Sequence, residues 1–296
     1  MHKLFPFLII IFLLACSGQN VAIPTIPAPT ATPISSLSLL KEIKLETQTN
    51  TAYTLVWSPD GNLLAIASGG EITILNSDLK IQNILQPENG ALGVTWNRDQ
   101  NSFATVNGFH NPAITILEWD GTENLTQSQQ IQADTDQYGV AWSPNGEMLA
   151  TLAGDSKSVI QIWDAITFEK INEFDLLYTK PRRTLQWSVD NSKVFSAGES
   201  NGQAVFFSIN ISDGTVHEIK TFPPSEAELF SIDSAEHLLA ISSPDGIVQF
   251  IDIKTDNRLT RMKTVNQPVD IAWHPNSNLL AVLDYQTTLQ LWLFIK

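Results

Sequence analysis

The sequence predicts an all-β fold in which six similar sheets stand as blades around a common axis. Three observations support this expectation. A nine-residue unit, usually headed by Trp, recurs six times along the chain. No segment shows an α-helical hydrophobic period of useful length. The last unit lacks a final strand that residues near the start of the domain can supply. Together these patterns place one domain at residues 37–296.

The repeated unit keeps a fixed register. It reads WSPDGNLLA from Trp57, WNRDQNSFA from Trp96, WSPNGEMLA from Trp142, WSVDNSKVF from Trp187, IDSAEHLLA from Ile232 and WHPNSNLLA from Trp273. The spacings are 39, 46, 45, 45 and 41 residues. A period of about 40–45 residues is typical of a β-propeller blade, so the sequence predicts a six-bladed β-propeller.

Each unit accounts for the strands of one blade. The apolar residues before each Trp, such as 54–56 and 139–141, predict innermost strands. Ser-Pro-Asp-Gly then predicts a tight turn, because Pro presets φ and Gly accepts a positive φ. Second strands are predicted at 63–67, 148–152 and 279–283, and third strands at 72–75, 114–117, 160–163, 205–207, 248–251 and 289–292. More polar fourth strands are predicted at 169–174 and 217–222.

The sixth unit ends after its third strand, because the sequence stops at Lys296. Residues 41–46, KEIKLE, resemble the fourth strand at 217–222, HEIKTF. We therefore expect an N-terminal strand to complete the last blade. Such closure leaves only short outer edges exposed.

Composition excludes several classes of protein. Of the 296 residues 43% are hydrophobic and 16% charged, which suits a chain with a packed core. The 17 Lys and Arg against 31 Asp and Glu give a net charge of −14. This balance argues against nucleic-acid binding and against a polybasic membrane patch. A single Cys excludes an intramolecular disulfide and a Cys-rich zinc site.

The first residues predict export from the cytoplasm. Lys3 precedes an apolar run at 7–14, which is too short to span a bilayer and is typical of a signal peptide at residues 1–15. Residues 13–16, LLAC, resemble the lipobox of bacterial lipoproteins. This resemblance implies cleavage after Ala15, diacylation of the Cys16 sulfur, and attachment to the bacterial cell membrane or outer membrane, facing outside the cytoplasm. The alternative is an ordinary secretory signal with an incidental Cys.

Residues 16–36 predict a tether that begins with the lipidated Cys. The stretch after Cys16 is rich in Pro and Thr, with four Pro and no charged residue. Such a segment cannot bury a core and is expected to be extended. At about 3.1 Å per residue it reaches at most roughly 60 Å.

The third strand of the third unit, IQIWD at residues 160–164, resembles the strand-ending Trp-Asp of the WD40 family. The shared last blade agrees with that resemblance, which implies a protein-binding propeller without a cofactor. The WSPDG motif and the count of six also suit propellers similar to the translocation protein TolB. Both subfamilies stay open.

Motifs for catalysis or metal binding are weak. Gly198, Ser200 and Gly202 match the Gly-x-Ser-x-Gly pattern of hydrolases, but they fall in a predicted hairpin where no helix follows. Four His remain after signal removal, and their unit positions place them on different faces: His110, His217, His237 and His274. We therefore expect no metal site. Asp155 and Asp284 occupy equivalent turns and are expected to hold those turns by hydrogen bonds.

A partner-binding surface is predicted on one rim of the ring. Loops that lead into the inner strands share this rim, here called the loop rim, with the turns between second and third strands. The longest loop, residues 176–184, carries Tyr178, Lys180, Arg182 and Arg183. Other predicted members are Phe109, His110 and Tyr138, with Asn107, Asp134, Asp136 and Asp155 alongside. A mixed aromatic and charged rim is typical of a binding face, and an ordinary solvated loop set is the alternative. The opposite rim, here called the turn rim, consists largely of the Ser-Pro-Asp-Gly-type turns.

The leading interpretation is a non-catalytic, membrane-tethered protein-interaction scaffold. It would be a monomer with an unidentified protein partner in the cell envelope, and without cofactor, metal or nucleic acid. One alternative is a propeller hydrolase or lactonase-like enzyme, which would project acidic, Asn or His side chains from several inner strands. The inner strands are mostly Leu, Val, Ala and Thr, with Asp270 as an exception. Another alternative, an outer-membrane assembly factor, is not separated from the leading interpretation by any sequence feature.

Overall fold

The computed structural model describes residues 36–46, 53–107, 112–122, 124–154, 158–178, 184–264 and 266–295. These residues belong to one compact unit, Ile34–Lys296. The predicted signal peptide, Cys16 and the tether up to residue 35 lie outside the described residues. The described part of the chain contains strands and turns but no helix, and so none with the length and apolar character that crossing a bilayer requires.

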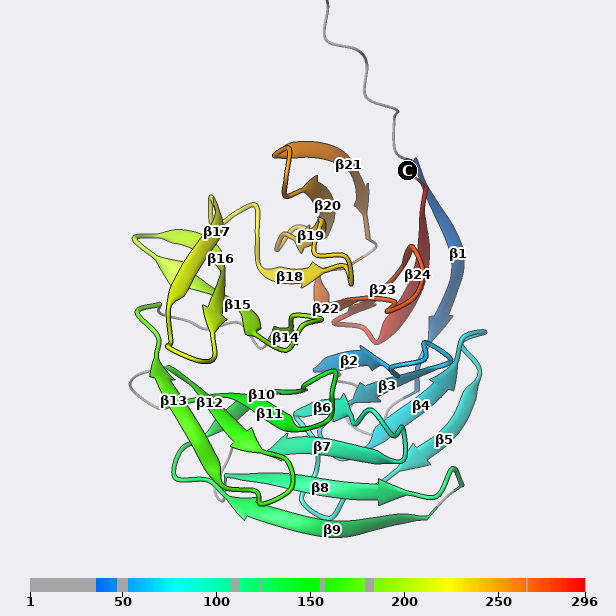
Figure 1. Cartoon of the computed structure of the whole chain (residues 1–296). Coiled ribbons are helices and arrows are strands. Elements are labelled where there is room, and N and C mark those ends of the chain that lie inside the picture. The colour runs from blue at the N-terminus through cyan, green and yellow to red at the C-terminus, as the bar shows by residue number, and fades with distance from the viewer. Residues whose placement is uncertain are drawn as a thin grey trace, which may run out of the picture. The chain divides into compact units, whose positions relative to one another are not determined.

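Six four-stranded antiparallel sheets form a β-propeller (Figure 1). The first blade contains β2 (Thr54–Trp57), β3 (Leu63–Ala67), β4 (Ile72–Asn76) and β5 (Ile81–Leu85). The second contains β6 (Gly93–Trp96), β7 (Ser102–Asn107), β8 (Ala113–Trp119) and β9 (Leu125–Gln132). The third contains β10 (Gln137–Trp142), β11 (Met148–Ala153), β12 (Val159–Asp164) and β13 (Lys170–Asp175).

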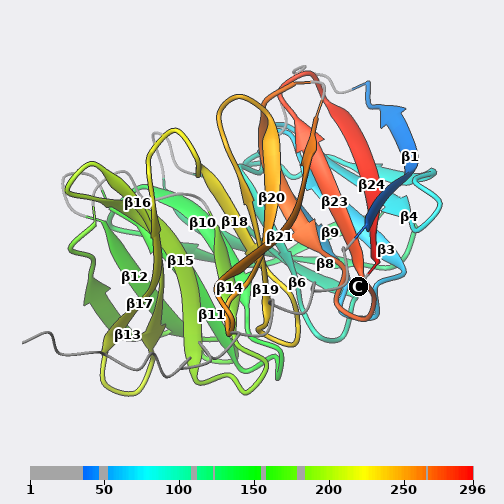
Figure 2. The same cartoon turned by 90° about the horizontal axis from the view of Figure 1, so that it is seen from above.

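The chain continues around the ring in the same order. The fourth blade contains β14 (Leu185–Trp187), β15 (Lys193–Ser200), β16 (Gln203–Asn210) and β17 (Val216–Phe222). The fifth contains β18 (Leu229–Ile232), β19 (Leu238–Ser242), β20 (Ile247–Asp252) and β21 (Asn257–Lys263). The sixth contains β22 (Pro268–Trp273), β23 (Leu279–Asp284), β24 (Thr288–Ile295) and β1 (Ser36–Lys44). Figure 2 shows the blades from above, with β1 beside β24.

The predicted closure by an N-terminal strand is confirmed, with a shift in its bounds. The expected strand was 41–46, whereas β1 runs from Ser36 to Lys44 and pairs with the whole length of β24. The reason is that β24 extends to Ile295 and offers partners as far back as Ser36. Leu45 continues the seam, because its N–H donates to the Thr287 carbonyl at 2.9 Å.

The hydrophobic core lies between the blades. Six clusters of buried side chains occur in the described residues, and each combines residues of two adjacent blades. Trp57, for example, packs with Leu283 of the sixth blade, and Trp96 packs with residues of the first. The repeated Trp therefore marks the position where one blade is packed against the preceding blade, as the fixed register of the repeat predicts.

Candidate functional site

A cavity of about 680 Å³ follows the axis of the ring. All six inner strands line it, together with the turns that follow them on the turn rim. Each blade contributes the residue two positions after its Trp or, in the fifth blade, after Ile232. These six residues are Pro59, Arg98, Pro144, Val189, Ser234 and Pro275, here called the collar. The collar is mostly apolar, with Arg98 as its one cation.

The indole groups of the repeated Trp connect neighbouring inner strands. Trp57 Nε1 donates to the Ala272 carbonyl at 3.3 Å, and Trp96 Nε1 donates to the Val56 carbonyl at 3.3 Å. Trp187 Nε1 donates to the Ala141 carbonyl at 2.9 Å. In each case the acceptor belongs to the residue just before the Trp of the preceding blade. This residue has an apolar side chain at all three junctions.

The other three junctions use a polar side chain at that same position. Thr95 Oγ1 accepts the Trp142 N–H at 3.1 Å, and Ser231 Oγ accepts the Trp273 N–H at 3.3 Å. The Gln186 amide accepts the Ile232 N–H and donates to the Ile232 carbonyl at 2.6 Å. Every junction therefore has a hydrogen bond from one inner strand to the next. Trp273 Nε1, at such a junction, is buried without a partner.

Asp270 is the carboxylate that the sequence places on an inner strand. Its Oδ2 accepts the Leu55 N–H of the first blade at 2.8 Å, and its Oδ1 accepts the Ile271 N–H at 2.9 Å. Both oxygens are therefore used to hold backbone groups at the junction of the sixth and first blades. This arrangement suits a structural carboxylate rather than a general base aimed at a substrate.

The turns of the turn rim share a polar framework. Ser58 Oγ donates to Asp60 Oδ1 at 2.6 Å and accepts the Leu63 N–H at 3.0 Å. Ser188 and Asp190 repeat this arrangement in the fourth blade. Hydrogen bonds from the Ser188 hydroxyl, and then from Ser192, lower the pKa of Asp190 to about 2. Burial alone would raise the pKa of Asp60, but bonds from Ser58 and Asn62 outweigh it, so that pKa is also lowered.

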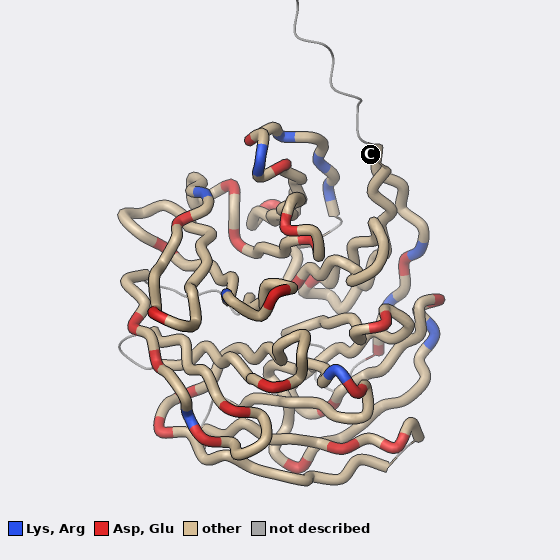
Figure 3. The backbone as a smooth tube through the Cα atoms, viewed as in Figure 1, with Lys and Arg blue, Asp and Glu red and all other residues tan. Residues whose placement is uncertain are grey.

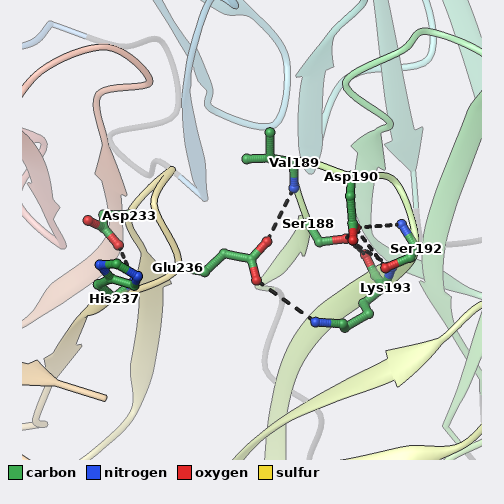
Figure 4. Close-up of polar contacts among 8 residues, drawn as sticks. All are labelled: Ser188, Val189, Asp190, Ser192, Lys193, Asp233, Glu236 and His237. Carbon is green, nitrogen blue, oxygen red and sulfur yellow. Dashed lines mark hydrogen bonds and ion pairs between the residues drawn. The ribbon is translucent and has the colours of Figure 1, made fainter. Parts of the chain in front are cut away.

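Neighbouring turns also bond to each other. Figure 4 shows Glu236 of the fifth blade reaching the fourth, where it accepts the Val189 N–H at 3.3 Å and lies 3.9 Å from Lys193 Nζ. Asp233 supports the turn that carries Glu236 by accepting the His237 N–H at 2.7 Å. The carboxylates around the mouth of the cavity therefore stabilise its wall.

His274 joins the turns of the sixth and first blades. Its Nδ1 accepts the Asn276 N–H at 3.0 Å, so its Nε2 carries the proton and donates to the Gly61 carbonyl at 3.1 Å. The ring also lies against Trp57, with centroids 4.8 Å apart. Burial lowers the pKa of His274, and this effect exceeds the opposing effects of the Gly61 bond and the Asp60 charge. A neutral His274 is thus part of the framework.

On the loop rim, the structure places Tyr178 inside and Tyr138 nearer the surface. Tyr178 is only 7% exposed, stacks on Phe207 with centroids 4.3 Å apart, and donates its hydroxyl to Glu218 Oε1 at 2.9 Å. Burial raises the pKa of the Tyr178 hydroxyl, and the hydrogen bond to Glu218 and the charge of that carboxylate raise it further. As a correction to the predicted binding rim, this ring packs in the core instead of facing a partner. Tyr138 is half-buried, and its hydroxyl is 3.5 Å from Asp136 Oδ2.

The remaining predicted rim residues divide into two groups. Asn107 is described, and its Oδ1 accepts the Ala113 N–H at 2.9 Å, which holds its turn. Phe109, His110, Asp155, Lys180, Arg182 and Arg183 lie outside the described residues. Asp284 accepts the N–H groups of Gln286 and Thr288 at 2.9 and 2.8 Å, so it performs the turn-holding role predicted for it.

The weak catalytic and metal motifs find structural explanations. Gly198, Ser200 and Gly202 lie at the hairpin between β15 and β16, as predicted. His237 and His274 belong to turns of different blades, and His217 lies on β17. The described part of the chain contains no group of three or more His, Cys, Asp or Glu side chains able to hold a metal ion.

Sequence reasoning missed a second Trp-Asp pair, Trp119-Asp120. Trp119 Nε1 donates to the Thr122 carbonyl at 2.5 Å, and Asp120 accepts from Thr122 and Asn124, so the pair builds a rigid turn. This turn borders a shallow cleft of about 700 Å³ whose lining residues are all uncharged: Leu63, Gln82, Asn83, Trp119, Gly121, Thr122 and Asn124. The Trp-Asp dipeptide itself could have revealed this turn. It lies two residues further along the third strand of its blade than Trp163-Asp164 does in the third blade.

Comparisons with known proteins agree with the fold. The family model of eukaryotic translation initiation factor eIF2A matches residues 73–181. Protein HIR1 from Candida albicans is 29% identical over 123 residues, which cover 42% of this chain and only 10% of HIR1. The β-propeller domain of Cps50 (Swd1) from Myceliophteria thermophila superposes with a TM-score of 0.66 at 13% identity, covering 87% of this chain and 99% of that domain. The chain is therefore similar to WD40-like β-propellers.

Proposed function

We propose that this chain is a lipid-anchored, non-catalytic protein-binding platform that faces outside the cytoplasm. The observation that carries the non-catalytic part is the use of the polar groups along the inner wall. Asp270, Gln186, Thr95 and Ser231 all hold backbone groups of the next blade. Because these side chains are bonded to the backbone of the next blade, they make the wall rigid and suit a scaffold better than a catalytic site.

Partner binding is assigned to the loop rim. Its loops differ in length and composition between blades, whereas the turn rim repeats similar Ser-Asp frameworks. Arg182 and Arg183 would supply bidentate contacts to an anionic group of a partner protein in the cell envelope. The similarity to HIR1 in part of the sequence and to the Swd1 β-propeller domain in fold supports a propeller platform by analogy and assigns no partner.

Membrane attachment is assigned to Cys16. It is the chain's single Cys and follows an apolar run too short to span a bilayer. Two or more acyl chains anchor a protein stably, whereas one binds only marginally. The ring itself would remain a monomer, because the β1–β24 pairing closes it.

The test combines fractionation with crosslinking in the native membrane. The wild-type chain should stay in the membrane fraction after a high-salt wash and yield a reproducible crosslinked partner by mass spectrometry. Cys16→Ala should leave the membrane fraction while its propeller still melts cooperatively. Retention of Cys16→Ala in the washed membrane would refute the lipid anchor, and the absence of any specific partner would refute the platform.

A further inference from the structure

We propose that the axial cavity binds a small carboxylate with an aliphatic body, and that Arg98 on the turn rim holds the carboxylate. This inference goes beyond the proposed platform, because it concerns a small molecule on the turn rim and not a protein on the loop rim. It rests on a preformed cavity, on an apolar wall, and on one cation at the turn rim that has no partner among the described residues.

The cavity has the size of a ligand pocket. Its volume of about 680 Å³ lies within the range of roughly 300–1,000 Å³ that small-molecule sites occupy. All six blades line it, and it reaches the turn rim in each of them, where the collar forms part of its lining. This volume exceeds that of a medium-chain fatty acid, so such a molecule fits inside the ring.

Bonds between turns of different blades hold the turn-rim end of the cavity in shape. Asn276 Nδ2 donates to the Asp60 carbonyl at 3.1 Å and thereby joins the sixth blade to the first. The Asn145 N–H donates to Asn191 Oδ1 at 3.0 Å and joins the third blade to the fourth. Glu236 joins the fifth blade to the fourth. A site that is formed before its ligand arrives loses little conformational freedom on binding, which favours affinity.

The wall offers an apolar surface to a ligand. Val56, Ala141, Leu185 and Ala272 line the cavity, each from a different blade. Four polar side chains of the inner strands, Asp270 among them, are bonded to backbone groups of the next blade. An aliphatic chain in the cavity therefore displaces water from apolar surface without breaking these bonds.

Four charged side chains line the cavity in the described part of the chain, and three of them are carboxylates that already accept hydrogen bonds. Asp233 accepts the N–H groups of its own turn, Glu236 accepts the Val189 N–H, and Asp270 accepts the Leu55 N–H. These acids are therefore committed to the wall and its turns.

Arg98 is the fourth charged side chain, and it is exposed. Its guanidinium makes no hydrogen bond or ion pair with any described residue. The adjacent carboxylate of Asp99 is directed to its own turn, where Oδ1 accepts the N–H groups of Asn101 and Ser102 at 2.9 and 3.1 Å. Gly146 of the third blade packs beside the base of Arg98, since a Cβ there would lie 3.6 Å from Arg98 Cβ. The guanidinium is thus available to a ligand.

Charge complementarity selects the class of ligand. The chain has a net charge of −14, and Figure 3 shows acidic residues in every blade and fewer basic ones. An anion is therefore attracted only where a cation is unpaired, and the other five collar residues are uncharged. A carboxylate matches the guanidinium because the two groups form parallel, charge-assisted hydrogen bonds. One charged end at Arg98 and an aliphatic body along the axis satisfy both surfaces.

Titration calorimetry with decanoate and decanol tests this assignment. The full chain with Cys16→Ala is used, because it carries no acyl groups that could occupy the cavity themselves. Decanoate should bind at one site per chain, and Arg98→Gln should weaken it about tenfold, whereas Arg98→Lys should retain part of the affinity. Arg258→Gln on β21 removes the same charge from an exposed Arg outside the cavity and should change nothing. Decanol should bind the wild type and Arg98→Gln alike.

A second variant locates the site without changing charge. Val189 belongs to the collar and is 59% exposed, so Val189→Trp narrows the cavity at the turn rim without removing a core contact. It should weaken decanoate and decanol alike, several-fold, while the urea unfolding curve stays that of the parent chain.

Three outcomes would overturn the inference. They are equal decanoate affinity for the parent chain and Arg98→Gln, unsaturable binding, and binding that Val189→Trp leaves unchanged. Arg182→Ala with Arg183→Ala should not affect decanoate, because those residues are assigned to the partner site. Failure of the carboxylate site would therefore leave the proposed platform standing, and failure of partner capture would leave the carboxylate site standing.

Discussion

The His274 imidazole lies against the backbone of Gly61, although the two residues are 213 positions apart in the chain. A Cβ at Gly61 would lie 2.2 Å from His274 Cε1 and 2.3 Å from Nε2, and Gly61 has φ +78°. Position 61 therefore requires glycine for two separate reasons, the backbone conformation and the space taken by the ring. This contact holds the first and last inner-strand turns together on the turn rim.

Gly61→Ala should strongly destabilise the propeller. We expect a loss of about 3 kcal/mol or more in the free energy of unfolding, measured by urea denaturation. Gly202→Ala is the matched control, because Gly202 also has a positive φ of +72° but no atom within 4 Å of the added Cβ. The control should cost only about 1–2 kcal/mol. Equal losses in the two variants would show that the His274 contact is unimportant.

The inter-blade indole bonds predict unequal effects of the same substitution. Trp187→Phe removes a 2.9 Å hydrogen bond and leaves the Ala141 carbonyl without this donor, whereas Trp273 Nε1 has no partner to lose. Both rings are buried, so the loss of volume is similar. Trp187→Phe should therefore be less stable than Trp273→Phe by about 1–2 kcal/mol in urea unfolding followed by circular dichroism. A reversed order would contradict the junction scheme.

Acid should destabilise the ring in two stages. Burial lowers the pKa of His274 below 6.5, so as the pH falls below 6.5 the unfolded chain binds a proton that the folded chain does not, and stability decreases. Above pH 6.5 this group is neutral in both states and has no effect. The contribution of Asp190, with a folded pKa of about 2, is lost at lower pH, between 3.8 and 2.

His274→Gln isolates the first stage. Between pH 7.5 and 5, the urea midpoint of the wild type should fall more than that of the variant, while both should lose stability alike below the range of His274. Parallel curves for the two proteins over the upper range would mean that His274 titrates normally in the folded ring.

Strand β1 should be essential for a monomeric ring. A chain that begins at Tyr53 exposes the apolar edge of β24, including Leu289 and Trp292, and should aggregate. A chain that begins at Ile34 keeps β1 and serves as the control. Size-exclusion chromatography with light scattering measures the outcome. A shorter chain that remains monomeric with an unchanged melting temperature would refute closure by β1.

The fold could be predicted because the information is local and repeated. Each Trp is followed within nine residues by its own turn and second strand, so one repeat explains the others. Closure could be predicted because residues 41–46 resemble the fourth strand of another blade, and the sixth unit has no fourth strand of its own. The start of β1 at Ser36 could not be predicted, because it depends on how far β24 extends. The two paired strands are separated in the sequence by all the other strands of the ring.

The site was harder to predict because its contacts connect different blades. Tyr178 looked like a surface aromatic beside basic residues, but Phe207 and Glu218, which cover it, lie on later strands. Asp270 looked like an isolated inner acid, but its partner Leu55 belongs to the first blade. Such roles become visible only when the ring brings distant blades side by side.

Partner capture after substitution of two sets of arginines is the most direct test of the binding platform. Arg182→Ala with Arg183→Ala, in the loop that the sequence predicts for the loop rim, should reduce the crosslinked partner from native membranes at least fivefold, while stability changes by no more than about 1 kcal/mol. Arg98→Ala on the turn rim should leave capture unchanged. Full capture by the double variant, or loss of capture only in Arg98→Ala, would contradict the account.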